Sequence, residues 1–260
     1  MATNDLAAAA QRRFSKWMVA AVLIAANAAT TAQVAPLAPR WLAGTPPPPV
    51  ETFAAGLERH QIALTESALI AALRDPDGEV RSLAAAQLAA MDDHAALKHI
   101  VRAFQDERDP QVQVNIAGAS TWLGSRLGLE QLQRMCADFN VPSTARLDAA
   151  RYVSNKSLPT CFSAVQEIAQ KEQDPSIRVL AIAAAVSYGG KPDRAQAVAV
   201  SALSDVDPSV RTAAADALLF LRATSAIGAL NRALQTEGDL TAREHLREAI
   251  RVLQLSRTPR

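Results

Sequence analysis

Aromatic residues are scarce in this chain. Phe, Trp and Tyr make up 4% of its 260 residues, although hydrophobic residues as a group make up 49%. The apolar content is therefore mostly Ala, Leu and Val, and Ala loses no side-chain entropy when it becomes helical. Runs such as SLAAAQLAAM and AIAAAV favour closely packed helices and argue against a β-sandwich.

An excess of one charge is also absent. The chain has 27 Lys and Arg against 26 Asp and Glu, a formal net charge of +1. The basic residues are interspersed with acids and form no continuous basic stripe. Binding to phosphate backbones requires such a stripe. We therefore expect no nucleic acid among its partners.

Residues that carry chemistry are few. The four histidines are His60, His94, His99 and His245. His94 and His99 are five positions apart, which does not place them on one face of a helix. We interpret MDDHAALKH as a solvated turn that starts a helix. The sequence has no glycine-rich phosphate loop, nucleophile elbow or paired zinc-ligand spacing. We expect no catalytic residue, no metal and no cofactor.

The N-terminal segment has the order of a secretory signal. In QRRFSKWMVAAVLIAANAATTAQ, basic residues precede a short apolar stretch, and small residues follow. This order is typical of exported proteins. An uncleaved membrane anchor over residues 17–32 is the alternative, although a span takes about 20 apolar residues and Asn27 interrupts this one. We expect residues 1–32 to direct export, so that the protein is periplasmic, secreted or anchored in the envelope membrane.

A proline-rich spacer follows the export segment. Residues 33–50 read QVAPLAPRWLAGTPPPPV, and prolines favour extended polyproline conformation. We assign residues 33–60 to this linker and an N-terminal cap, and residues 61–260 to one folded domain.

The folded domain is built from a repeat. Stretches similar to DVDPSVRTAAADALLFL recur, and their anchor residues lie 32, 33, 32, 33 and 32 positions apart. The six anchors are Arg81, Gln113, Arg146, Arg178, Arg211 and Arg243. Six copies at so regular a period predict a repeat architecture.

An acidic residue opens most copies. An Asp at a helix N-cap accepts a bond from an orphaned backbone N–H, and a following Pro already has a helical φ. The expected caps are Asp77, Asp109, Asp174, Asp207 and Asp239. Thr241 is an alternative to Asp239, because it would form a capping box with Glu244. The third copy has Val-Pro-Ser instead of Asp-Pro, so its helix start is not fixed by a cap.

Each capped helix has one apolar face, and a second apolar helix precedes it. In the first copy the apolar stripe is Val80, Ala84, Leu88 and Met91. A further apolar set lies about thirteen residues before the anchors: Ile100, Leu132, Val165, Val198 and Leu230. One helix–turn–helix unit cannot bury both faces alone, so stacking of about six units predicts an all-α solenoid.

These copies resemble a known family. DPxVR followed by an Ala- and Leu-rich helix, at a period near 32, is similar to the short HEAT-like repeats that also occur in phycobilin lyase subunits. The resemblance covers roughly residues 62–256. It implies that the Asp and Arg positions form a hydrogen-bonded ladder between neighbouring units, with Gln113 contributing only a neutral donor.

The two cysteines, Cys136 and Cys161, would enter an oxidising compartment on export. If they lie on neighbouring parallel helices, they differ by about 12 Å along the axes. That separation exceeds the Cα–Cα limit of about 7 Å for a disulfide. We expect free thiols.

A partner surface is predicted on the second helix of each unit. Several apolar residues there occupy positions that face away from the core stripe, and large exposed apolar residues mark interfaces. The candidate contact residues are Val114, Trp122, Arg151, Asn155, Val186, Asp216, Leu219 and Phe220. Burial of these residues between adjacent second helices is the alternative. We expect a non-catalytic exported scaffold that binds a protein or peptide along the concave face of the solenoid. The alternative, which the family resemblance implies, is a lyase-like enzyme or the accessory subunit of an enzyme.

Overall fold

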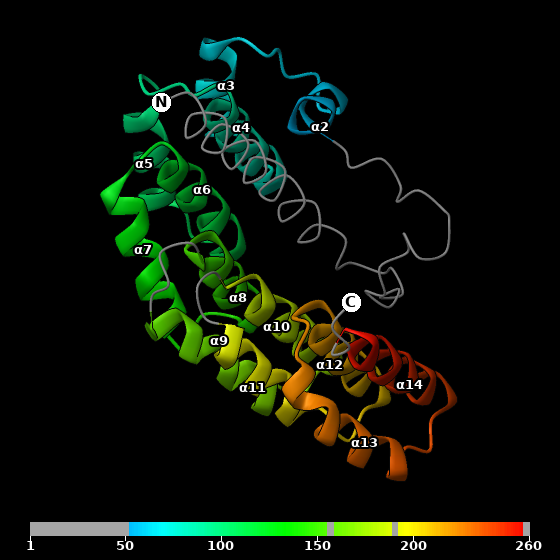
Figure 1. Cartoon of the computed structure of the whole chain (residues 1–260). Coiled ribbons are helices and arrows are strands. Elements are labelled where there is room, and N and C mark those ends of the chain that lie inside the picture. Colours follow the sequence, from blue (N-terminus) through cyan, green and yellow to red (C-terminus); the bar gives the residue numbers. More distant parts are fainter. Residues whose placement is uncertain (1–51, 155–158, 189–191, 257–260) are drawn as a thin grey trace, which may run out of the picture. The chain divides into compact units, whose positions relative to one another are not determined.

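Every regular element of the described residues is a helix (Figure 1). The structure, a computed structural model, describes residues 52–154, 159–188 and 192–256. These residues divide into two compact units between Met135 and Cys136.

The first unit contains α2 (Phe53–Arg59), α3 (Glu66–Ala72), α4 (Gly78–Ala90), α5 (Leu97–Asp106) and α6 (Pro110–Trp122). The helix α7 (Arg126–Ala137) crosses the division. The second unit contains α8 (Ser143–Tyr152), α9 (Pro159–Lys171), α10 (Pro175–Ser187), α11 (Pro192–Ala202), α12 (Pro208–Phe220), η3 (Thr224–Ala226), α13 (Ile227–Thr236) and α14 (Leu240–Leu255).

The predicted helix–turn–helix unit is confirmed. In the first unit, α3 packs on α4 and α5 on α6, and α4 packs beside α6. In the second unit, the pairs are α9 with α10, α11 with α12 and α13 with α14. The first helices of these pairs form one layer, and the second helices α10, α12 and α14 form the other (Figure 1). The second helices therefore pack mainly against their own partner and the equivalent helix of the next pair.

The capping aspartates start the second helices as predicted. Asp77, Asp109, Asp174 and Asp207 each accept a bond from a backbone N–H in the first turn of their helix. Asp239, and not Thr241, caps α14, accepting from the Ala242 N–H at 2.9 Å. In the third copy, Pro142 precedes α8 without a side-chain cap. A capping Asp therefore marks where these helices begin, with or without a following Pro, since Gly78 and Leu240 follow two of the five caps.

The core follows the predicted stripes with one correction. Val80, Ala84 and Leu88 are buried, and so are the members of the first-helix set. Met91, however, is 46% exposed. It is the C-cap of α4, which ends at Ala90. Leu123 occupies the equivalent C-cap position of α6 and is buried, so the exposure of Met91 is particular to the first copy.

The two cysteines form a disulfide, so the expectation of free thiols is wrong. Cys136 and Cys161 are fully buried and their Cα atoms lie 5.0 Å apart. Cys136 is in the last turn of α7, and Cys161 is in the first turn of α9. The expectation assumed parallel helices in matched register. The end of one helix instead meets the start of the other, which removes the axial separation.

The predicted signal and spacer, residues 1–50, lie outside the described residues. The cap region is partly described, because α2 follows the spacer and packs against α4. Within the described ranges, none of the helices has the length and apolar character needed to cross a membrane.

Candidate functional site

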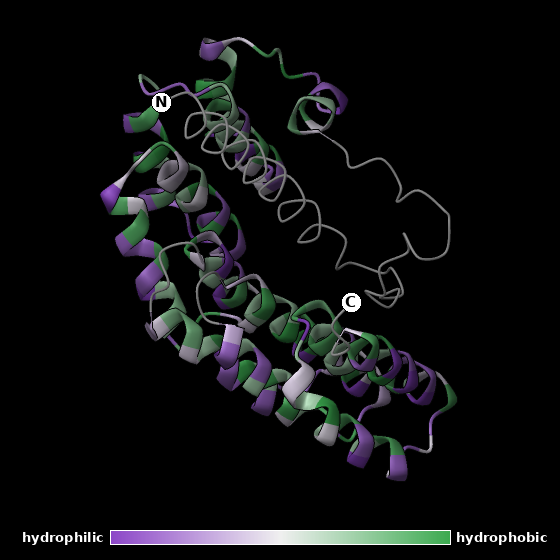
Figure 2. Cartoon of the chain, in the orientation of Figure 1, coloured by the Kyte–Doolittle hydropathy of each residue, from purple (hydrophilic) through white to green (hydrophobic). Residues whose placement is uncertain are grey.

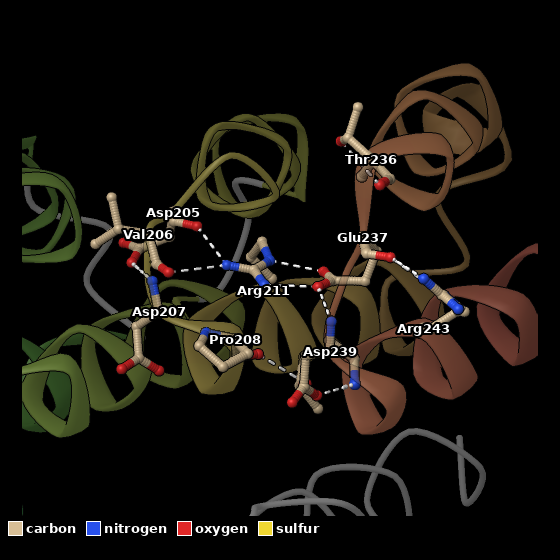
Figure 3. A network of polar contacts seen from close by, with 12 residues as sticks. Asp205, Val206, Asp207, Pro208, Arg211, Thr236, Glu237, Asp239 and Arg243 are labelled. Atoms are coloured by element: carbon tan, nitrogen blue, oxygen red, sulfur yellow. Dashed lines mark hydrogen bonds and ion pairs between the residues drawn. The ribbon is translucent and has the colours of Figure 1, made fainter.

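The anchor arginines join consecutive repeats. Arg211 on α12 donates from Nε and Nη2 to the two carboxylate oxygens of Glu237, both at 2.6 Å (Figure 3). Its Nη1 donates to the carbonyl oxygens of Asp205 and Val206 at 2.8 and 3.0 Å. One guanidinium therefore fixes the linker before its own helix and the linker before the next second helix.

Glu237 is the buried member of this pair. Its side chain is 0% exposed, against 18% for Arg211. It also accepts the backbone N–H of Asp239 at 2.9 Å, at the start of α14 (Figure 3). The hydrogen bonds from Arg211 hold the pKa of the Glu237 carboxyl below its ordinary value of 4.5, against the opposing effect of burial. The ionised form is thus the stable one in the folded protein.

The same geometry recurs at two other junctions. Arg178 donates from Nε and Nη2 to Asp205 at 2.8 and 2.7 Å. Arg81 donates from Nε to Glu107 at 2.7 Å. Both arginines also donate from Nη1 to two carbonyl oxygens of the linker before their own helix.

The ladder uses an acid that the sequence reasoning did not select. The capping aspartates accept from their own helices, whereas the arginines bond to the acid six residues before the next anchor. A signal for this acid was present in the sequence. An acidic residue lies two positions before each capping aspartate: Asp75, Glu107, Glu172, Asp205 and Glu237.

The second and third anchors make different contacts. Gln113 donates from Nε2 to the carbonyl oxygens of Phe104 and Glu107, and accepts from Gln131 Nε2 at 3.1 Å. The acid position six residues before the third anchor holds Asn140. Gln113 and Asn140 occupy the two positions that form the ladder ion pair in other repeats. Both side chains are neutral, so these two residues cannot form that ion pair.

Arg146 bonds both to its own repeat and to α9, the first helix of the next pair. Its Nε donates to the carbonyl of Cys136 at 3.1 Å, and its Nη2 to Glu167 at 3.2 Å. The guanidinium carbon lies 4.7 Å from the centre of the Phe139 ring, a cation–π contact. Glu172, which would pair with this anchor in other repeats, accepts from Ser143 Oγ instead.

Acid should destabilise the ladder. The pKa of Glu107 is also lowered, because hydrogen bonds from Arg81 and from the backbone outweigh the raising effect of its burial. A carboxyl with a lowered pKa contributes stability that is complete above its unfolded pKa and is lost as the pH falls toward the folded pKa. We expect the melting temperature to fall from about pH 4.5 downward. The Glu237→Gln variant should have a lower melting temperature at neutral pH, and its melting temperature should decrease less as the pH falls, as measured by calorimetry at a series of pH values. Parallel profiles for the variant and the wild type would contradict a stabilising role for the ionised Glu237.

The predicted partner residues divide between core and surface. Val114 is fully buried, because second helices pack side by side at that position of the repeat. It belongs to the core and cannot contact a partner. Trp122, Val186 and Leu219 are half-buried, and Phe220 is 75% exposed. Asn155 lies outside the described residues.

Val186, Leu219 and Phe220 define an apolar patch in the second unit. Leu219 follows Val186 by 33 residues, so both occupy the same repeat position at the C-terminal ends of α10 and α12. These two helices pack against each other. Figure 2 shows hydrophobic residues over most of both helices, whereas hydrophilic residues are more frequent on α14.

Charged residues accompany this patch. Asp216, one turn before Leu219 on α12, lies 2.8 Å from His245 Nδ1 on α14. Burial raises the pKa of the Asp216 carboxyl, and the contact with His245 opposes that shift. Arg151 on α8 lies 3.5 Å from Asp148 on the same helix. Each predicted charged contact residue thus has an intramolecular partner.

The described residues contain no cluster of three or more His, Cys, Asp and Glu side chains that could hold a metal ion. His94 lies in the turn before α5, 3.6 Å from Asp92. Asp93 accepts from two backbone N–H groups of that turn. MDDHAALKH is therefore a turn that starts a helix, as its sequence predicted.

Comparison with known proteins agrees with the repeat. The family model for HEAT repeats matches residues 66–154 and 162–251. No curated protein matches the sequence. Among solved structures, the chain is similar to human deoxyhypusine hydroxylase in complex with glycerol. The identity is 17% and the TM-score 0.42, over 93% of this chain and 96% of that one.

Proposed function

The chain belongs to the HEAT-repeat family, and on that premise we propose that it is a non-catalytic scaffold that binds a protein or peptide partner. Stacked helix pairs present a continuous row of equivalent second helices. Side chains on such a row can contact an extended partner without forming a catalytic pocket. The recurring contacts between repeats then serve to hold the binding surface in shape.

The observation that carries this proposal is the exposure of Phe220 beside Leu219 and Val186. Phe220 is 75% exposed although it ends a helix whose other large apolar residues are mostly buried. Aromatic anchors near the centre of an interface dominate binding energy. The patch therefore suits a partner that presents an apolar side chain, and Asp216 offers a polar group at its edge.

We further propose that the protein acts outside the cytoplasm, in the periplasm or as a secreted protein. The N-terminal order of basic, apolar and small residues supports export. The Cys136–Cys161 disulfide also supports it, because disulfides persist in oxidising compartments. Both observations are independent of the partner surface.

Phe220→Asp should abolish capture of the partner. A carboxylate at this position would have to lose its water on contact with an apolar side chain, which costs several kcal/mol, of order 2–5. The mature wild-type protein and the variant are each immobilised and exposed to a cell-envelope extract, and the retained proteins are identified by mass spectrometry. We expect one or more proteins to be retained by the wild type and at least tenfold less by Phe220→Asp.

Leu240→Asp is the matched control. Leu240 is 73% exposed at the start of α14, where an acidic residue suits the helix dipole. This variant should capture the same proteins as the wild type. Equal capture by Phe220→Asp and the wild type, with unchanged helicity, would refute the patch as the binding surface.

A further inference from the structure

Two clefts lie at equivalent places in the repeat. The cleft in the first unit, of about 340 Å³, lies between the first helices α3 and α5 beside the Arg81–Glu107 pair. The cleft in the second unit, of about 600 Å³, lies beside the Arg211–Glu237 pair. Each lining residue of the second cleft follows its equivalent in the first by 130 positions, as Arg232 follows Arg102. The ladder thus forms one wall of both.

The two clefts differ in charge outside this shared framework. Arg74 in the first cleft corresponds to Ser204 in the second, and His99 corresponds to Ala229. Arg108 also lines only the first cleft, and Gly238 occupies the equivalent position. Asp106, which corresponds to Thr236, adds one negative charge to the first cleft. The first cleft still has a net excess of positive charge over the second, while both keep the ladder pair.

Most acidic side chains of the first cleft already have hydrogen-bond or ion-pair partners within the protein. Glu107 is bound by Arg81 and by the backbone N–H groups of Arg108 and Asp109. Asp75 accepts the backbone N–H of Asp77. Asp106, the remaining acid, lies 3.5 Å from Arg102 in an exposed pair.

Two arginines that line the cleft, Arg74 and Arg108, have no such partners in the described part of the chain. Across the described residues, no ion pair or side-chain hydrogen bond engages the guanidinium of Arg74 or Arg108. Both side chains are exposed. An exposed pair such as Arg102–Asp106 contributes little and exchanges readily. Arg74 and Arg108 are therefore available to carboxylates, and Arg102 can exchange Asp106 for another carboxylate.

The floor of the cleft is apolar. Ile70, Leu73 and Ala103 line it between the charged residues. A ligand with carboxylates alone would leave this floor in contact with water. A ligand that pairs acidic side chains with an aliphatic one would satisfy both features.

We propose that this cleft binds a short acidic segment of a protein, with glutamate or aspartate side chains on Arg74, Arg102 and Arg108 and an aliphatic side chain against the floor. Arginine binds carboxylates bidentately, and complementary charge directs such segments to their site. A nucleic acid is a poorer match, because Asp106 lies among the arginines and no basic stripe continues the site. The site is separate from the apolar patch on α10 and α12.

The test uses the whole mature protein and a fluorescein-labelled octapeptide, EELEDLEE, with fluorescence anisotropy as the readout. We expect saturable binding that weakens with added salt. The isosteric peptide QQLQNLQQ should bind at least tenfold more weakly. Equal binding of the two peptides would overturn the proposal.

The site is located with Arg74→Ala/Arg108→Ala, which alters only exposed side chains. This double variant should lose about tenfold in affinity while its melting temperature is unchanged. The control Lys171→Ala/Arg247→Ala also removes two exposed positive charges, both from the second unit, and should bind like the wild type. Loss of binding in both double variants would show a general charge effect and overturn the site.

The class of ligand is tested with a single-stranded oligonucleotide. The assignment to a peptide would be overturned if the oligonucleotide bound more tightly than EELEDLEE and lost this binding in Arg74→Ala/Arg108→Ala. None of these results depends on Phe220, so the two proposals fail separately.

Discussion

Replacement of Arg211 by alanine should lower the free energy of unfolding by about 3 kcal/mol, because it leaves a buried carboxylate without its partner. Glu237 has a side-chain exposure of 0% and receives two hydrogen bonds from Arg211. The carbonyl oxygens of Asp205 and Val206 also lose their donor. In a chain of this size the loss corresponds to a decrease in melting temperature of roughly 10 °C, measurable by calorimetry.

Arg251→Ala is the matched control for this prediction. Arg251 also donates two hydrogen bonds to one carboxylate, that of Glu248, at 2.8 and 2.7 Å. That pair is exposed to water on α14. An exposed ion pair adds little to stability, so the control should melt with the wild type. Similar losses in the two variants would mean that burial of Glu237 is not what makes the ladder important.

Removal of the disulfide should cost about 3 kcal/mol, since the bond joins residues 25 positions apart and restricts the unfolded chain. Oxidised wild-type protein should show no free thiol when denatured without reductant. Reductant should then lower its midpoint in a urea titration. Two titratable thiols in the unreduced protein would contradict the Cys136–Cys161 bond.

Cys136→Ala/Cys161→Ala is the control for nonspecific effects of reductant. Its urea midpoint should be low both with and without reductant. Both cysteines are fully buried, so truncation to alanine adds a packing loss to the loss of the bond. The double variant should therefore be no more stable than the reduced wild type.

The repeat was predictable because its signals are local. An Asp-Pro pair fixes where a helix starts, and the 3.6-residue period fixes which face is buried. Both depend on neighbours within one turn, so α6, α10 and α12 begin at the prolines that the sequence indicates. Met91 is the exception, since it is exposed although the equivalent Leu123 is buried.

The contacts between repeats were harder to predict. Whether Arg211 bonds to a capping aspartate or to Glu237 depends on how far the next pair is displaced along the stack, and no local rule fixes that displacement. The prediction of free thiols at Cys136 and Cys161 was wrong for the same reason. Their separation was calculated from matched parallel helices, whereas the last turn of α7 meets the first turn of α9. Val114 was placed on the surface because the side-by-side packing of second helices could not be measured from spacing alone.

The double use of Glu237 and Asp205 has a consequence for protein engineering. Each carboxylate orders the start of the helix that follows it and also neutralises the arginine of the helix before it. Truncation of the array after α12 would remove Glu237 and leave Arg211 without its carboxylate. Lengthening or shortening the array by one whole repeat avoids this, because each repeat carries one arginine and one acid. Deletion of the 33 residues 179–211, for example, removes Asp205 and Arg211 together and brings Glu237 to the corresponding place after Arg178.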